Sequence, residues 1–292
     1  MNSIRRFLIL ASIVASPSVV RGQGLDTAKI DQALGRPGQK IADVYKVGFF
    51  RTDLHVSVHG LAIKPGLALG SWAAFTGTES DAMVMGDLVL LEDEVNPVME
   101  KLRSAGFEIS AVHNHLIDET PHVMYMHYMG HGEASQLAAS LRAALAVSKT
   151  PLEKPATAAE APTQPSWVKT VENSVGRSGT FKGGVLSYGV PRADTVTVNG
   201  LAIAPAAGVA ESINFQEADT GNVAATGDFV LTADEVNPVI SELHAHHIAV
   251  TALHSHMLTE QPRLFFLHFW AVGRTESVGG GIAAALKHVS AK

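Results

Sequence analysis

The chain has 292 residues and a formal net charge of −6, and its pI is near 6.1. This acidic balance excludes the basic field that nucleic-acid binding requires, and no polybasic run indicates a lipid-headgroup partner. Hydrophobic residues make up 46% of the chain, which is ordinary for a globular protein, and the length suggests about two domains. Cysteine is absent, which excludes disulfides, thiolate nucleophiles and cysteine metal ligands.

The N-terminus, residues 1–22, predicts a secretory signal peptide. The basic segment MNSIRR precedes the apolar run FLILASIVA at residues 7–15, and small residues lead to a cleavage position before Gln23. An apolar run of this length is too short for a bilayer, which needs about twenty residues. We therefore expect a periplasmic or secreted protein, exported by the Sec or the twin-arginine route, with no transmembrane span in the mature chain.

The rest of the chain contains two copies of one unit, offset by 141 residues, as His113 and His254 show. We place the first unit at residues 23–148 and the second at 166–292. Between them, residues 149–165 are rich in proline and alanine and predict an extended linker. The second unit lacks one residue before Gly200 and regains the register by Gly227, as expected at a loop or a bulge.

Apolar periodicity predicts the same order of elements in both units: a short helix, three strands, a helix, two strands and a closing helix. The residue before a proline avoids the helical region, so we expect the middle helices to begin at Pro97 and Pro238, although Thr232 and Glu235 also form a capping box. This order predicts an α+β fold of two tandem pseudo-symmetric units, each a mostly antiparallel sheet with helices on one face. The predicted elements are helices 30–34, 97–104, 134–146, 238–246 and 281–289, and strands 53–58, 71–75, 82–91, 107–115, 123–129, 195–198, 223–231, 248–256 and 264–270.

A histidine-rich segment organises each unit. AVHNHLIDETPHVMYMH at residues 111–127 returns as ALHSHMLTEQPRLFFLH at residues 252–268. In a strand, residues i and i+2 share a face, and a returning hairpin strand can add a third imidazole and a carboxylate at the bend. Such a set predicts a site for a divalent transition metal, namely Zn, Mn, Fe or Ni, as one site per unit or one site shared between units. The predicted ligands are His113, His115, Glu119, His127, His254, His256, Glu260 and His268.

Two interpretations of these residues remain open. The histidines persist in both units while their neighbours 124–126 and 265–267 differ, which favours an exported metal-binding protein, whether or not it is a metalloenzyme. His122 or His131 can add a ligand in the first unit. Alternatively, the histidines form a hydrogen-bonded polar pocket, in a non-catalytic envelope module for a glycan, peptide or protein partner. In either case the partner is an unknown small molecule or envelope component.

Two further pairs of charged residues recur. Arg51 and Asp53 match Arg192 and Asp194, and this spacing predicts an arginine–carboxylate ion pair in each unit. Glu94 and its counterpart Glu235 lie at predicted helix starts, where the helix dipole favours a carboxylate. A general-base role for these two glutamates is the alternative.

Several strings resemble the LppY/LpqO family of exported bacterial proteins, a domain of unknown function: RTDLHVSVHGLAI at 51–63, GDLVLLEDEVNPV at 86–98 and GDFVLTADEVNPVI at 227–240. The resemblance implies an envelope location and supplies no catalytic residue, and this chain lacks the lipid-bearing cysteine of the lipoprotein members. The spacing His-x-His-x3-Glu is also similar to the cupin metal motif. However, a helix precedes the motif strand where a jelly roll would have strands, so we interpret this similarity as convergent.

Overall fold

The structure, a computed structural model, describes residues 24–153 and 164–292. We call these two parts unit one and unit two. The predicted signal peptide and residues 154–163 of the predicted linker lie outside the described residues. Each unit is built on a six-stranded antiparallel sheet, and the strand order is the same in both.

In unit one the strand order across the sheet is β1-β2-β5-β6-β9-β7. Three helices cover one face of this sheet. The strands are β1 (Gln39–Ile41), β2 (Val44–Phe50), β5 (Gly70–Gly77), β6 (Ala82–Leu91), β7 (Glu108–His113) and β9 (Val123–Gly132), and the helices are α1 (Thr27–Leu34), α3 (Glu92–Ser104) and α4 (Ala134–Leu145).

Unit two repeats this arrangement in the order β10-β11-β14-β15-β18-β16. Its strands are β10 (Thr180–Lys182), β11 (Val185–Pro191), β14 (Ala210–Asp219), β15 (Asn222–Leu231), β16 (Ala249–His254) and β18 (Phe265–Arg274), and its helices are α5 (Ser166–Val175), α6 (Ala233–Ala245) and α7 (Thr275–Leu286). The predicted α+β fold with antiparallel sheets and tandem units is therefore confirmed.

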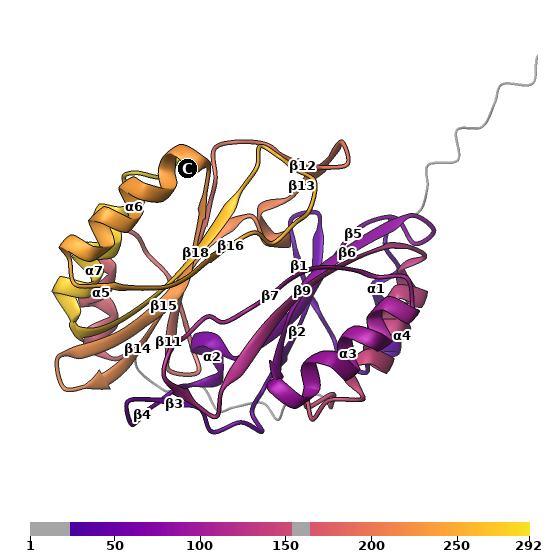
Figure 1. The fold of residues 1–292 in the computed structure, drawn as a ribbon, viewed down its shortest axis with the longest axis horizontal. Helices are drawn as coiled ribbons and strands as arrows, with labels where there is room; N and C mark the ends of the chain where they lie inside the picture. Colours follow the sequence, from indigo (N-terminus) through magenta and orange to yellow (C-terminus); the bar gives the residue numbers. More distant parts are fainter. Residues whose placement is uncertain (1–23, 154–163) are drawn as a thin grey trace, which may run out of the picture.

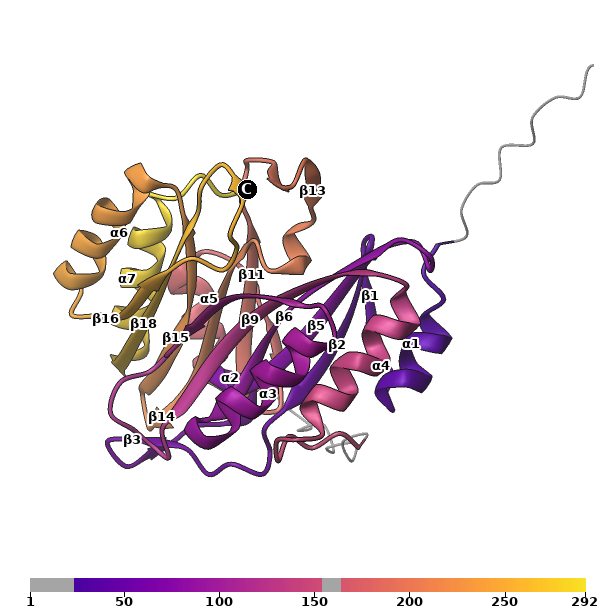
Figure 2. The ribbon, with the colours of Figure 1, turned by 45° about the vertical axis from the view of Figure 1, so that its right-hand side comes forward.

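The molecule has four layers, helices–sheet–sheet–helices, with the inner faces of the two sheets turned toward each other (Figures 1 and 2). The outer face of each sheet packs on its own helices in a separate apolar cluster. Two further apolar clusters contain residues of both units. Because both faces of the sheet are covered, β6 is buried along almost its whole length, which explains its nearly continuous apolar sequence.

Each unit also carries a small three-stranded sheet and a short helical turn that reach toward the other unit. In unit one these are β3 (Ser57–Val58), β4 (Leu61–Ala62), β8 (Glu119–Thr120) and α2 (Pro65–Ala68); in unit two they are β12 (Val196–Val198), β13 (Leu201–Ile203), β17 (Glu260–Gln261) and the 3-10 turn η1 (Pro205–Ala207).

The buried Gln216 amide clasps the loop before α2: its Oε1 accepts from Lys64 N–H at 2.8 Å, and its Nε2 donates to Ala62 O at 2.8 Å. In the opposite direction, Lys46 Nζ donates to the Ala206 carbonyl at 3.2 Å. Hydrogen bonds thus join the two units at both places.

The predicted starts of the middle helices were wrong. Helix α3 begins at Glu92 and α6 at Ala233, five residues before Pro97 and Pro238 respectively. A glutamate side chain accepts from the backbone N–H at each helix start, Glu94 from Leu91 at 2.9 Å and Glu235 from Thr232 at 2.7 Å. This capping stabilises the earlier helix start by more than the proline destabilises it. Because proline lacks an N–H, the helix loses only one hydrogen bond, to a first-turn carbonyl that is exposed to solvent.

Sequence patterns also missed β2 and β11, whose alternation is interrupted by Gly48 and Gly189. The one-residue shift between the units is resolved by a bulge between Glu217 and Asp219 in β14. As a result Ser212 faces Asp228 across the sheet just as Trp72 faces Asp87, so Ser212 is the structural counterpart of Trp72.

Candidate metal centre

The histidines lie on the central and edge strands of each sheet. His127 is in the middle of β9, opposite Ala111 of β7, while His113 ends β7 opposite Tyr125. His115 follows two residues later and shares the inner face with His113, as the alternation predicted. In unit two, His268 of β18 lies opposite Ala252, and His254 ends β16 opposite Phe266. Both sets project into the space between the two sheets.

The six imidazoles of the two units form one cluster. Ring centroids lie 3.5 Å apart for His113 and His254, 3.7 Å for His115 and His268, and 3.6 Å for His127 and His256. These pairs follow the two-fold relation of the repeat: His113 pairs with its own counterpart, and the other two pairs exchange roles. The cluster is therefore shared between the units, one of the two arrangements that the sequence left open.

The imidazoles present one nitrogen each to the interior of this cluster. The Nδ1 atoms of His113, His254 and His268 lie 3.1, 3.4 and 3.1 Å from backbone carbonyl oxygens. A hydrogen bond from Nδ1–H to a carbonyl fixes the tautomer in which Nε2 carries the free lone pair. The Nε2 atoms of all six histidines are buried and have no hydrogen-bond partner. This is the arrangement that metal-binding histidines need.

Two aspartates complete the cluster, and sequence reasoning missed both as ligands. Asp87 lies directly opposite His127 in the sheet, and Asp228 lies opposite His268. Asp87 Oδ2 is 3.7 Å from His115 Nε2 and 3.9 Å from His127 Nε2, while Asp228 Oδ1 is 2.7 Å from His268 Nδ1. A signal was present in the sequence, since each is the one acidic residue within an apolar strand and recurs in the other unit.

Groups of these side chains can hold a metal ion, because their ligand atoms lie within 4.8 Å of one another. Two of the three groups contain a carboxylate and share no residue. One of these two draws on both units. The groups are Asp87, His113 and His127; His115, Asp228 and His268; and His113, His254, His256 and His268.

Burial favours the neutral form of five of the six histidines, which is the form that binds metal. Desolvation, followed by the charges of neighbouring histidines, lowers the pKa of His127 to about 3 and that of His254 to about 4. The same causes hold the pKa values of His113, His115 and His256 below their ordinary value. At neutral pH these imidazoles are therefore available as ligands without releasing a proton from Nε2.

The charged groups of the centre influence one another. Burial, and then the charge of Asp228, raises the pKa of Asp87 well above its usual range. Burial acts on Asp228 in the same direction, but the adjacent His268 ring outweighs it, and the pKa of Asp228 is lowered. Burial lowers the pKa of Lys46 to about 8 against the opposing effect of both aspartates. The two carboxylates thus face a space with little solvent to stabilise their charge.

The predicted ligands Glu119 and Glu260 lie at the hairpin turns and belong to none of the three groups. Glu119 Oε1 is 3.4 Å from the Val123 backbone N–H that donates to it and 2.9 Å from His122 Nδ1. Glu260 Oε1 accepts from Leu264 N–H at 3.1 Å. Each carboxylate thus closes the turn that its hairpin makes, because the backbone N–H four residues later lies within reach.

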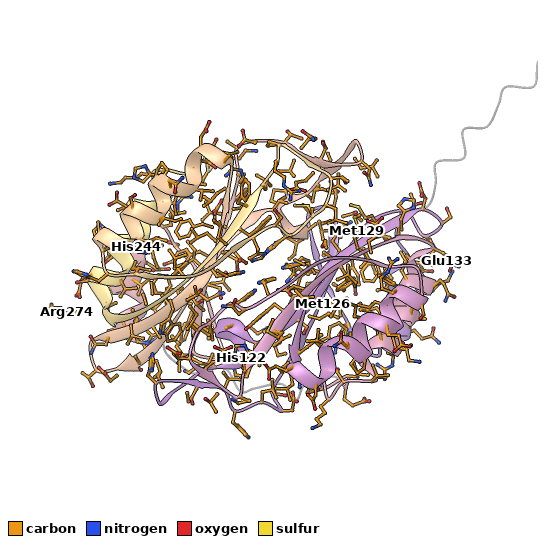
Figure 3. All side chains as sticks on the ribbon, in the orientation of Figure 1. His122, Met126, Met129, Glu133, His244 and Arg274 are labelled. Carbon is orange, nitrogen blue, oxygen red and sulfur yellow. The ribbon has the colours of Figure 1, made fainter. Side chains whose placement is uncertain are left out.

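Three further histidines lie away from the cluster. His122 pairs with Glu119 at the hairpin, and the exposed His131 pairs with Asp81 at 3.2 Å. His244 lies on the outer helix α6, on the far side of the sheet from the centre (Figure 3). None of these three belongs to the groups of potential ligands among the described residues.

The recurring arginine pairs are confirmed as buried ion pairs. Arg51 Nη2 lies 2.9 Å from Asp53, and its Nη1 lies 2.7 Å from Glu94. Arg192 binds Asp194 and Glu235 at 2.6 and 2.8 Å. The oxygens of Glu94 also accept from the backbone N–H groups of Leu91 and Lys149. These contacts give Glu94 and Glu235 a structural role that joins the helix start to the sheet.

Comparisons with known proteins identify the family. Residues 28–147 and 169–288 each match the family described as Domain of Unknown Function (DUF1259), so the chain belongs to that family and contains two tandem copies of its domain. No curated protein matches the chain. A solved structure, a trimeric bacterial microcompartment shell protein PduB, matches over 86% of this chain and 89% of that chain, with 11% identity and a TM-score of 0.20. A likeness this weak carries no argument about fold or function.

Within residues 24–153 and 164–292, no helix combines the length and apolar character needed to cross a membrane.

Proposed function

We propose that this protein binds a divalent transition metal in the space between its two units. The observation that carries the proposal is the set of six buried Nε2 atoms that lack hydrogen-bond partners, together with Asp87 Oδ1 in the same condition. Leaving a buried polar atom unsatisfied costs about 1–3 kcal/mol. A cation coordinated by these atoms removes that cost for several of them at once.

The charge of the cluster supports a cation. The two aspartates are buried among imidazoles, and a buried carboxylate is costly unless it is paired or coordinates a metal. One divalent ion balances two carboxylates. The donors are imidazole nitrogens and carboxylate oxygens, which suit Zn, Mn, Fe or Ni and exclude the soft thiolate chemistry of Cu(I).

Metal analysis of the protein purified without a histidine tag tests this proposal. We expect at least about one equivalent of transition metal per chain, by analogy with closed histidine sites. Stripping the metal with a chelator is expected to lower the melting temperature, because ligands that bind only the folded state stabilise it. The variant His244→Ala is the matched control, since this histidine lies on α6, and it should keep its metal. Untagged protein that neither contains nor takes up metal overturns the proposal.

We further propose that the chain is exported. The basic and apolar pattern of residues 1–22 and the resemblance to the LppY/LpqO proteins support this location. Mass spectrometry of the periplasmic and secreted fractions tests it. A mature N-terminus at Gln23 is the expected result, and intact protein confined to the cytoplasm contradicts it.

A further inference from the structure

The centre offers more donor side chains than one ion can use. Six imidazoles and two carboxylates meet between the units, and the Nε2 atoms of all six imidazoles are buried without a hydrogen-bond partner. A tetrahedral ion such as Zn takes four ligands, and an octahedral ion takes six. One ion therefore leaves at least two of these side chains uncoordinated, whereas two four-coordinate ions use all of them.

Two of the groups of potential ligands have no residue in common, and each combines two imidazoles with one carboxylate. They are Asp87 with His113 and His127, and Asp228 with His115 and His268. The ligand atoms within each group lie within 4.8 Å of one another, and the donors of a tetrahedral ion lie about 3.4 Å apart when each is about 2.1 Å from the ion. Each group is thus compact enough to surround an ion of its own after small rotations of the side chains.

Asp87 reaches both of these groups. Its Oδ2 atom lies 3.9 Å from Nε2 of His127, in its own group, and 3.7 Å from Nε2 of His115, in the other. Its Oδ1 atom is buried without a hydrogen-bond partner, so it too is available to a cation. Asp228 differs, because its Oδ1 lies 2.7 Å from Nδ1 of His268, which is not the nitrogen that the imidazole presents to the centre. The carboxylate in position to join two ions is therefore that of Asp87.

We propose that the centre is dinuclear: it holds two divalent transition-metal ions, and the Asp87 carboxylate bridges them. The inference rests on the proposed metal site. A carboxylate that reaches both groups holds the ions at the short spacing of two-metal sites, about 3.5–4 Å. Because the two carboxylates balance the charge of only one divalent ion, the second ion binds more weakly than the first.

Stepwise loading of the untagged full chain with Co(II) tests this inference. Bound cobalt is counted by equilibrium dialysis, and an EPR spectrum is recorded at each step. We expect about two equivalents of cobalt at saturation. Up to the first equivalent the EPR signal should grow with bound cobalt. Beyond it, the signal per cobalt ion should fall, because the spins of neighbouring ions couple.

A variant of the bridging residue tests the role of Asp87. Asp87→Asn should lower the bound cobalt from about two equivalents to about one, and the remaining ion should give the EPR signal of isolated cobalt. Asp81→Asn is the matched control, because it removes the same charge just before the same strand. Asp81 is exposed and pairs with His131 at 3.2 Å, so this variant should keep both ions and their coupling.

The measurements on the wild type decide the number of ions whether or not the variants fold. Saturation at one equivalent, or two equivalents without spin coupling, overturns this inference and leaves the metal site standing. Two coupled ions in Asp87→Asn, or no bound ion at cobalt concentrations that saturate the wild type, overturn the assignment of Asp87 as the bridge. A wild type that takes up no cobalt overturns the proposed function itself.

Discussion

The two units are built alike where they meet at the metal centre and differ at its edges. Three histidines and one aspartate occupy matched positions in each sheet, and their pairing across the interface follows a two-fold relation. At the edges, unit one has Lys46 and Trp72 at the positions where unit two has Ser187 and Ser212. The repeat thus supplies the candidate ligands in duplicate, whereas differences between the copies make one side of the centre chemically distinct.

One unit alone is incomplete, because each unit covers the inner sheet face of the other. The inner face of each sheet is covered by residues of the other unit in two apolar clusters, one containing Met85 and Phe266, the other containing Tyr125 and Val185. Ser110 Oγ donates to His256 O, and Thr251 Oγ1 donates to His115 O at 2.6 Å. Separated units would expose apolar surface and backbone acceptors at the very place where the histidines lie.

The largest expected effect on stability concerns the buried arginine ion pair, which both units contain. Arg51→Met and Arg192→Met each leave two carboxylates without their buried partner. We expect each variant to lose about 3–5 kcal/mol of unfolding free energy, because breaking a buried ion pair leaves an uncompensated charge. Chemical denaturation measures this loss. A loss in only one of the two variants would show that the ion pair stabilises the two units unequally.

The ligand set is tested by changing one unit at a time. Because the cluster is shared, His127→Ala and His268→Ala should each weaken metal binding by the whole centre about 100-fold, which corresponds to roughly 2.7 kcal/mol. Competition with a chromophoric chelator measures the affinity. If each variant instead keeps half of the metal at wild-type affinity, the cluster holds two independent ions and the coupling of the whole centre is wrong.

The clasp between the units is tested at Gln216, whose side chain is 1% exposed. Gln216→Leu leaves the backbone N–H of Lys64 and the carbonyl of Ala62 without their partner. We expect a loss of about 2 kcal/mol in unfolding free energy, within the cost of an unsatisfied buried group. Thr259→Ala, which alters a hydrogen bond on the exposed surface, is the control and should change stability by less than about 0.5 kcal/mol. Equal losses in the two variants would contradict a buried clasp.

The smallest expected effect is a gain of stability, on removal of the Asp87 charge. A raised pKa means that folded Asp87 binds protons more tightly than the unfolded chain does. The contribution of Asp87 to the stability of the metal-free protein should therefore fall as pH rises above the unfolded value of about 3.9. The lowered pKa values of the buried histidines act in the opposite direction over the same range. Asp87→Asn removes this charge and should stabilise the metal-free protein at pH 7 by about 1 kcal/mol, while weakening metal binding. Thermal unfolding of both proteins from pH 4 to pH 7 measures this contribution as the difference between wild type and Asp87→Asn, and a destabilised Asp87→Asn protein would contradict it.

Local sequence patterns predicted the fold class and the six histidines that the candidate metal centre brings together. Alternation in 107–115 and 248–256 placed two histidines of each unit on one strand face, because successive side chains of a strand point to opposite sides. Helix α1 ends at Gly35 in a left-handed conformation, as the glycine there indicated. Patterns failed where another contact decided the outcome, as at Pro97, where a glutamate cap begins the helix earlier.

By itself, the sequence determined that two equivalent units carry a histidine set each, since the repeat is a property of residue order. Only the tertiary structure decided that the two sets meet in one centre, that Asp87 and Asp228 join them, and that Glu119 and Glu260 remain at the turns. The physical reason is that periodicity assigns a side chain to a face of its own strand. Which surface covers that face depends on packing between residues more than a hundred positions apart.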